Sequence, residues 1–197
     1  MKIVLDGNIG CGKSSIINKI TETNYFNLPV FNEPLNNWDK WLELFYSNMN
    51  KYSFGFQMRV LKSHLDNKVI TKGIFERSPL SCQRVFGEIL FEDKMMTKLE
   101  WDLTEEFFND YGWIPDLIIY LRCDPETCFS RINQRNRNSE ENIRMEYLER
   151  LYNKYEKLYN SSELGHKYIK VIQVDATQSI DVVFDEIIDK VNSFMNN

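Results

Sequence analysis

The feature that most constrains this chain is residues 7–14, which read Gly-Asn-Ile-Gly-Cys-Gly-Lys-Ser. This segment matches the phosphate-loop pattern, in which two spaced glycines are followed directly by Lys and Ser. A short apolar run precedes it at residues 2–5, and apolar residues at helical spacing follow it at residues 15–20. A glycine-rich turn without a ligand would not explain Lys and Ser at this offset. The motif therefore predicts a strand, a loop and a helix that bind a nucleoside triphosphate.

The chemistry of the loop gives each part a role. Glycine lets the backbone wrap closely around an anion, with N–H groups pointing inward at the start of a helix. Lys13 is expected to reach the β- and γ-phosphates, and the Ser14 hydroxyl to hold a Mg²⁺ ion that bridges them. The residues expected to contact the triphosphate here are Gly7, Asn8, Ile9, Gly10, Cys11, Gly12, Lys13, Ser14 and Ser15.

Composition bounds the class of protein. The net charge of −5 argues against a protein that binds nucleic acid through bulk electrostatics. A length of 197 residues with 43% hydrophobic content suits a single domain, residues 1–197. No apolar run is long enough to span a membrane, so no membrane partner is expected. The four cysteines are interpreted as reduced thiols, and a first strand at residue 2 leaves no room for a signal or transit peptide. We therefore expect a cytoplasmic protein.

Strand-like and helix-like segments alternate along the chain. Further strands are predicted at residues 28–32, 72–75, 116–121 and 169–174, and a last amphipathic helix at residues 180–194. This alternation predicts an α/β fold, a five-stranded parallel sheet flanked by helices, with ligands at the carboxyl ends of the strands. The polar motifs follow those ends. The phosphate loop comes after the first strand, Glu33 after the second, Glu76 and Arg77 after the third, and an arginine cluster after the fourth.

The arginine cluster predicts a lid. Asp124 and Pro125 form a good helix start, with Asp as N-cap and Pro at the first helical position. Arg131 and Arg135 are four residues apart and share a helical face, and Arg137 follows where the helix should fray. Positioned guanidinium groups stabilise the charge of a transferring phosphoryl group. We interpret residues 131–141 as an arginine-rich lid that closes over ATP.

Five motifs together resemble a known family. They are the phosphate loop, Glu-Pro-x-x-x-Trp at 33–38, Phe-Gln at 56–57, Glu-Arg-Ser at 76–78, and Arg-x-x-x-Arg-x-Arg at 131–137 followed by Glu-Glu. In this order and spacing the chain resembles the deoxyribonucleoside kinases, from residue 2 to about residue 159. That family includes deoxycytidine kinase, deoxyguanosine kinase, mitochondrial thymidine kinase and the broad-specificity insect enzyme. The resemblance implies transfer of the γ-phosphate of ATP to the 5′-hydroxyl of a deoxyribonucleoside, and a homodimer.

The resemblance also implies catalytic roles. Glu33 matches the carboxylate near the 5′-hydroxyl, so it is the favoured general base, with Glu76 beside magnesium; the reverse assignment stays open. Arg77 is expected to lie near the 5′-oxygen and to orient Glu33. Residues given a catalytic role are Glu33, Glu76, Arg77, Lys13, Arg135 and Arg137, and the metal side comprises Ser14 and Glu76.

Substrate contacts are implied in the same way. Gln57 matches the glutamine that faces the base edge, while Tyr46 and Glu140 (rather than Glu141) match residues that meet the sugar 3′-hydroxyl. The whole set for the nucleoside is Glu33, Trp38, Tyr46, Phe56, Gln57, Arg77, Cys82, Phe86 and Glu140. The loop after the last strand should pass over the adenine, and Arg131, Arg135, Gln178, Ser179 and Ile180 complete the ATP contacts.

Two departures from the family bear on the base. Where deoxycytidine and deoxyguanosine kinases carry an Arg and an Asp flanking the base, this chain has His64 and Cys82. Without that ion pair the pocket loses its groups for exocyclic amines and purine edges. The sequence therefore favours a pyrimidine, with thymidine first and deoxycytidine second; His64 as a satisfied helix residue is the alternative.

Two other functions were considered. A nucleoside monophosphate kinase, such as thymidylate kinase, shares the loop and the lid but needs further basic groups for the acceptor phosphate, which the Glu33 carboxylate would repel. A non-catalytic nucleotide-binding switch would need guanine-reading motifs such as Asn-Lys-x-Asp, and this sequence has none.

Overall fold

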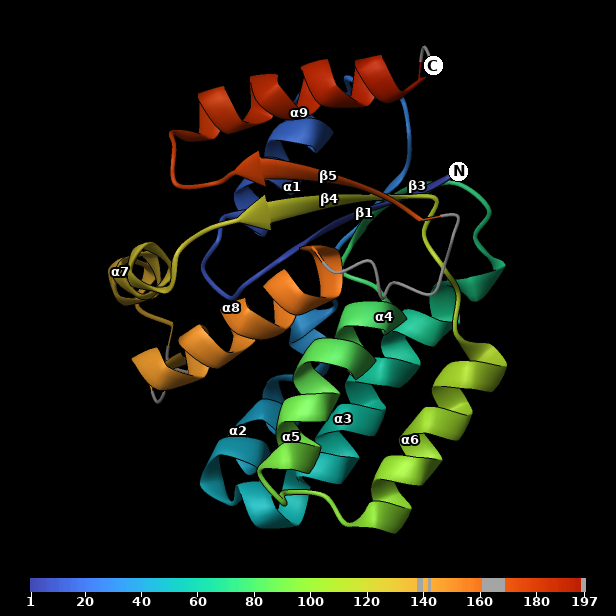
Figure 1. The fold of residues 1–197 in the computed structure, drawn as a ribbon, viewed down its shortest axis with the longest axis vertical. Coiled ribbons are helices and arrows are strands. Elements are labelled where there is room, and N and C mark those ends of the chain that lie inside the picture. The colour runs from blue at the N-terminus through green and yellow to red at the C-terminus, as the bar shows by residue number, and fades with distance from the viewer. Residues whose placement is uncertain (138–139, 142, 161–168, 196–197) are drawn as a thin grey trace.

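The computed structural model describes residues 1–137, 140–141, 143–160 and 169–195. Residues 138–139 of the expected lid lie outside this described part. The five strands of this described part form one parallel sheet, as predicted, and their order in it is β2-β3-β1-β4-β5 (Figure 1). Their bounds are β1 Lys2–Gly7, β2 Val30–Phe31, β3 Gly73–Glu76, β4 Leu117–Arg122 and β5 Lys170–Asp175.

The second strand is shorter than predicted. It was expected over residues 28–32, but β2 comprises only Val30 and Phe31 and pairs with β3 alone. Pro29 has no N–H to donate, although its carbonyl accepts from Ile74 N at 2.9 Å. An edge strand bounded by proline cannot extend its ladder, so pairing stops early. Strands β3, β4 and β5 agree with the prediction to within one residue at each end, whereas β1 extends to Gly7, two residues beyond the apolar run at residues 2–5.

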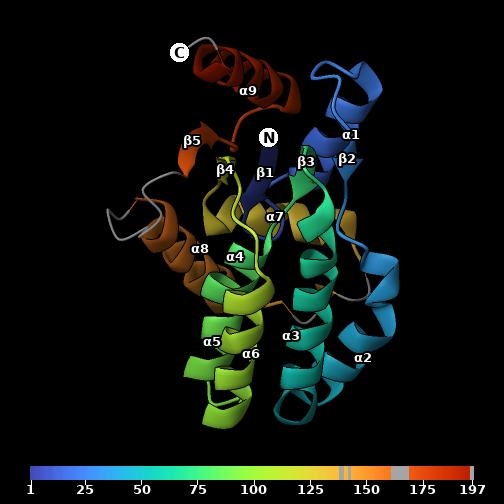
Figure 2. The same cartoon turned by 90° about the vertical axis from the view of Figure 1, so that its right-hand side faces the viewer.

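Helices cover both faces of the sheet. Helices α1 (Lys13–Thr23) and α9 (Ile180–Met195) cover one face, and most of the other helices lie below the opposite face (Figures 1 and 2). The elements that follow β2 are η1 Leu35–Asn37, α2 Asp39–Ser47, α3 Met49–Leu65 and η2 Asp66–Val69. Those that follow β3 and β4 are α4 Pro79–Ser81, η3 Cys82–Gly87, α5 Glu88–Glu92, α6 Lys98–Tyr111, α7 Pro125–Arg135 and α8 Met145–Asn160.

The core lies between the sheet and these helices. Strand β4 is buried at every position but Arg122, which fits a central parallel strand covered on both faces. All four cysteines are buried and free. In the part of the chain that the structure describes, no helix is long and apolar enough to cross a bilayer.

The arrowheads of β4 and β5 point towards α7, so the site predicted at the carboxyl ends lies on this side of the sheet (Figure 1). Helix α7 begins as the sequence predicts, because the Asp124 side chain accepts a hydrogen bond from Thr127 N at 2.7 Å and Pro125 occupies the first turn. It ends at Arg135, and Asn136 takes a left-handed conformation with φ 47°. Arg131 and Arg135 are therefore helical, and Arg137 follows the helix.

Candidate active site

The phosphate loop joins the end of β1 to the start of α1. Gly10 and Gly12 have φ values of 81° and 102°, in the region that favours glycine. A Cβ at Gly10 would lie 2.5 Å from the carbonyl oxygen of Cys128, so no larger residue fits there. The Lys13 ammonium is buried inside the loop and donates to the carbonyl oxygens of Gly7 at 3.1 Å and Asn8 at 2.7 Å. The loop thus carries a fixed cation at its centre.

Two carboxylates and an arginine lie beside this loop. Ser14 Oγ donates to Glu76 Oε1 at 3.0 Å, which links the start of α1 to the end of β3. Arg77 NH1 donates to Glu33 Oε2 at 2.5 Å, and the backbone N–H of Glu33 points to Glu76 Oε2 at 3.4 Å. Burial raises the pKa of the Glu33 carboxyl, while the Arg77 guanidinium opposes that shift. The predicted catalytic carboxylates and Arg77 are therefore in one cluster.

Arg77 is held in a strained conformation by residues that sequence reasoning missed. Its φ is 59°, which costs a non-glycine residue on the order of 1 kcal/mol. Arg77 Nε lies 3.4 Å from Tyr155 OH and 3.9 Å from Asp6 Oδ1. Asp6 is fully buried and accepts from the hydroxyls of Tyr155 at 2.9 Å and Tyr159 at 2.8 Å. One signal was available, since Asp6 is a carboxylate that directly follows the apolar run Ile3-Val4-Leu5.

A cavity of about 390 Å³ opens from this cluster. Its surface is mostly apolar, with several aromatic side chains, and its charged groups include Glu33, Arg77 and the lid arginines Arg135 and Arg137. Every residue that the resemblance assigned to the nucleoside lines it, namely Glu33, Trp38, Tyr46, Phe56, Gln57, Arg77, Cys82, Phe86 and Glu140. Sequence reasoning missed other lining residues, including Leu42, Phe45, Val60 and Tyr147.

A second cavity, of about 540 Å³, lies along the outside of the phosphate loop. The two cavities meet, because Gly10, Lys13, Ser14 and Arg135 line both. Of the expected ATP contacts, Ile9 lines the first cavity, whereas Gly7, Asn8 and Ser179 are not among the described residues that line either. Asn8 instead donates from its side chain to the Leu148 carbonyl at 3.0 Å. The second cavity is lined by Gly10, Cys11, Gly12, Lys13, Ser14, Ser15, Arg131, Arg135, Gln178 and Ile180, among others.

The three lid arginines have different partners. Arg131 donates from NH1 to Ala176 O at 2.7 Å, and its NH2 is 3.3 Å from Thr177 O and 3.4 Å from Gln178 O. Arg131 therefore holds the loop after β5 in place through its backbone carbonyls. Arg135 makes a two-pronged contact with Glu140, 2.6 Å from each carboxylate oxygen, and Arg137 NH1 lies 3.7 Å from the same carboxylate. Glu140 lines the first cavity, whereas Glu141 is exposed.

His64 and Cys82 both line the first cavity and both are uncharged near neutral pH. Burial, with a smaller contribution from Arg77, lowers the pKa of His64 to about 3, and burial raises the pKa of the Cys82 thiol. Gln57 Nε2 donates to the Cys82 carbonyl at 2.9 Å, which fixes the side-chain amide of Gln57. Cys82 begins η3, a π-helical segment, and such segments occur frequently at functional sites.

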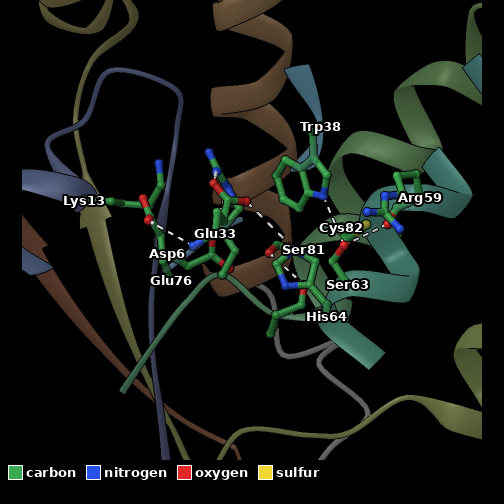
Figure 3. A network of polar contacts seen from close by, with 12 residues as sticks. Asp6, Lys13, Glu33, Trp38, Arg59, Ser63, His64, Glu76, Ser81 and Cys82 are labelled. Atoms are coloured by element: carbon green, nitrogen blue, oxygen red, sulfur yellow. Dashed lines mark hydrogen bonds and ion pairs between the residues drawn. The ribbon is translucent and has the colours of Figure 1, made fainter. Parts of the chain in front are cut away.

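Glu33 lies between Glu76 on one side and Trp38 and His64 on the other (Figure 3). A lysine-centred phosphate loop that opens into a mainly apolar cavity with a buried carboxylate at the junction defines a phosphate-loop kinase for a small organic acceptor. A family model described as deoxynucleoside kinase matches residues 3–196. The chain therefore belongs to the deoxynucleoside kinase family, whose members are ATP-dependent phosphotransferases.

Individual relatives agree with the family. Putative kinase protein 029R of invertebrate iridescent virus 3 is 32% identical over 186 residues, which cover 92% of this chain and 91% of the viral protein. Human deoxycytidine kinase is 27% identical, with coverage of 99% of this chain and 91% of the human protein. The solved structure of deoxyadenosine kinase from M. mycoides superposes with a TM-score of 0.84 at 27% identity, covering 98% of this chain and 100% of that one.

Proposed function

We propose that this kinase transfers the γ-phosphate of ATP to the 5′-hydroxyl of a deoxyribonucleoside. The observation that carries the proposal is the junction of the two cavities at Lys13 and Ser14, with Glu33 lining the first cavity beside it. ATP in the second cavity would present its γ-phosphate at this junction. A nucleoside in the first cavity would present its 5′-hydroxyl to Glu33.

The residues at the junction fit the chemistry of this transfer. Glu33 takes the proton of the 5′-hydroxyl as that oxygen bonds to the γ-phosphorus, and the bond to the β–γ bridging oxygen breaks. Arg77 orients Glu33 through the 2.5 Å contact. Lys13, Arg135 and Arg137 supply positive charge where the transferring group is most negative.

Ser14 and Glu76 fit a magnesium site. Their side-chain oxygens lie 3.0 Å apart at the mouth of the loop, and Mg²⁺ is commonly bound by one or two protein oxygens together with phosphates and water. When bound, the ion would neutralise charge on the β- and γ-phosphates. This placement supports Glu33, rather than Glu76, as the general base.

For the acceptor we propose a pyrimidine deoxynucleoside, with thymidine first. His64 and Cys82 place no ion pair in the cavity, and Gln57 offers an amide that can pair with the edge of a pyrimidine. The relatives include a deoxycytidine kinase and a deoxyadenosine kinase, so family membership alone does not choose the base. The proposal rests on these three residues.

One assay tests acceptor and base together. ADP release is coupled to NADH oxidation, with ATP and each of the four deoxynucleosides, and with thymidine monophosphate in parallel. We expect thymidine to exceed deoxyadenosine and deoxyguanosine by about tenfold or more in kcat/KM, with no turnover of the monophosphate. Preference for a purine would contradict the proposal that His64, Cys82 and Gln57 favour a pyrimidine. Turnover of the monophosphate alone would support the thymidylate-kinase alternative.

The lid arginines give a prediction with a built-in control. Arg135→Ala or Arg137→Ala should lower kcat more than it raises the KM for nucleoside, because these groups act on the transition state. Lysine at either position should restore activity only in part, since it lacks the planar fork. Arg131→Ala is the matched control, because its contacts are to the loop after β5, and it should act mainly on the KM for ATP. Steady-state kinetics in both substrates separate the effects; changes confined to the KM for ATP in all three variants would contradict the prediction.

We also propose a homodimer, as the family resemblance implies. An apolar stripe on α6, formed by Leu99, Leu103, Phe107 and Tyr111, supports it, because the four side chains are 82, 40, 38 and 53% exposed. Leu103→Glu should convert a dimer to a monomer in sedimentation velocity. Val182→Glu, at an exposed apolar position on α9, is the control and should leave the dimer intact. A monomeric wild-type protein would contradict the proposal.

A further inference from the structure

His64 lines the first cavity and is buried, and two tryptophans contact it, one at its backbone and one at its ring. Its side chain is 3% exposed, and among the described residues Nε2 has no hydrogen-bond partner. The indole N–H of Trp113 donates to the His64 carbonyl at 2.7 Å, and the ring of Trp38 lies edge-on with centroids 6.1 Å apart. An unpartnered buried polar atom is costly, so its position at this cavity calls for a role.

This nitrogen faces the carboxylate proposed as the general base. His64 Nε2 lies 3.8 Å from Glu33 Oε1, and both side chains are drawn in Figure 3. The other oxygen of the same carboxylate, Oε2, is held by Arg77. The two oxygens therefore have different neighbours, a cation on one and an imidazole on the other.

His64 remains neutral here because it is buried beside the Arg77 guanidinium. A neutral imidazole carries a proton on one ring nitrogen only, and a carboxylate opposite Nε2 favours the tautomer with the proton on that nitrogen. The charged and titratable groups around Glu33 are Asp6, Lys13, His64, Glu76, Arg77 and Cys82. Arg77 carries the charge that pairs with Glu33, and His64 adds a directed N–H without adding a second cation.

We propose that His64 is a positioning residue for Glu33, which uses its Nε2–H to fix the plane of the carboxylate. Arg77 alone holds one oxygen and leaves the carboxylate free to turn about its last bond. The Nε2–H faces Oε1 across 3.8 Å, so its attraction is electrostatic rather than a formed hydrogen bond; it opposes that rotation and keeps the carboxylate directed at the acceptor hydroxyl. This role rests on the proposed function of Glu33 as general base.

The test uses variants that separate the effect of the N–H group from the effect of side-chain size. His64→Met keeps an apolar side chain of similar size, and His64→Gln places an amide N–H near the position of Nε2. We expect His64→Met to lower kcat roughly tenfold, with the KM for nucleoside and for ATP changed less than threefold, and His64→Gln to recover most of the loss. Lys62→Gln, on the exposed side of the same helix, is the matched control. Thermal melting of each variant checks that the fold is retained.

A double-variant cycle shows whether His64 acts through Glu33. If it does, His64→Met should cause no further loss of kcat in a Glu33→Gln background. A full additional loss in that background would overturn the proposal, as would wild-type activity of His64→Met or a loss confined to the KM for nucleoside. If Glu33→Gln itself retains normal kcat, the assignment of the base fails, and that result is distinct from the others.

Discussion

Glu33→Gln is expected to keep the fold and ATP binding and to lower kcat by about 100-fold or more, the usual scale for a general base. Glutamine has nearly the same shape and can still contact Arg77, but it cannot take the proton of the acceptor hydroxyl. The loss should therefore appear in kcat and not in the affinity for ATP. Steady-state kinetics, together with calorimetric titration of ATP, measure the two quantities separately.

Glu76→Gln is the matched comparison for this prediction. Glu76 contacts Ser14 at the mouth of the phosphate loop, so its replacement should weaken the response to Mg²⁺ concentration as well as kcat. Near-normal turnover of Glu33→Gln beside an inactive Glu76→Gln would reverse the two roles. A titration of activity against Mg²⁺ distinguishes the carboxylates even if both variants are slow.

Asp6→Ala is expected to lower the free energy of unfolding by about 3–5 kcal/mol, the range for removing one partner of a buried ion pair. Asp6 is fully buried and accepts hydrogen bonds from Tyr155 OH, Tyr159 OH and the backbone N–H of Gly7. Its loss leaves these donors unsatisfied and Arg77 with less compensating charge. Urea denaturation followed by circular dichroism measures the effect.

An exposed aspartate provides the control for this stability prediction. Asp181 pairs with Lys19 but its side chain is 76% exposed. Removing a pair so open to solvent should change the stability by less than about 1 kcal/mol. Equal unfolding midpoints for Asp6→Ala and the wild type would contradict the importance of the Asp6 network.

Local sequence patterns predicted the fold well, but they did not predict the Asp6 network beside the site. The parallel sheet and the edge that carries the site could be inferred because glycine-loop, carboxylate and arginine motifs each follow a strand, whereas the order of the strands was not predicted. The site residues around Glu33 came from the resemblance. Asp6 was missed because its partners, Tyr155 and Tyr159, lie on α8, far along the chain. Nothing local in the sequence relates a strand residue to tyrosines at such a separation.

The direction in which each side chain points is the second feature that the sequence did not predict. The spacing of Arg131 and Arg135 places them on one helical face, yet Arg131 binds backbone carbonyls of the loop after β5 while Arg135 binds Glu140. Which way each guanidinium points depends on how α7 packs against the sheet, and periodicity within α7 does not carry that information. The approach of His64 to Glu33 is of the same kind, because it depends on the rotation of α3 about its axis.

The position of β1 at the centre of the sheet has a consequence for how the protein folds. Ile3 pairs with Ile74 on β3 and with Leu117 on β4, so β1 is synthesised before both of the strands that it pairs with. Closing such long loops is slow, and apolar strands that wait for partners are exposed to aggregation. A nascent chain that ends before β3 therefore carries the phosphate-loop sequence without a strand to pair with β1.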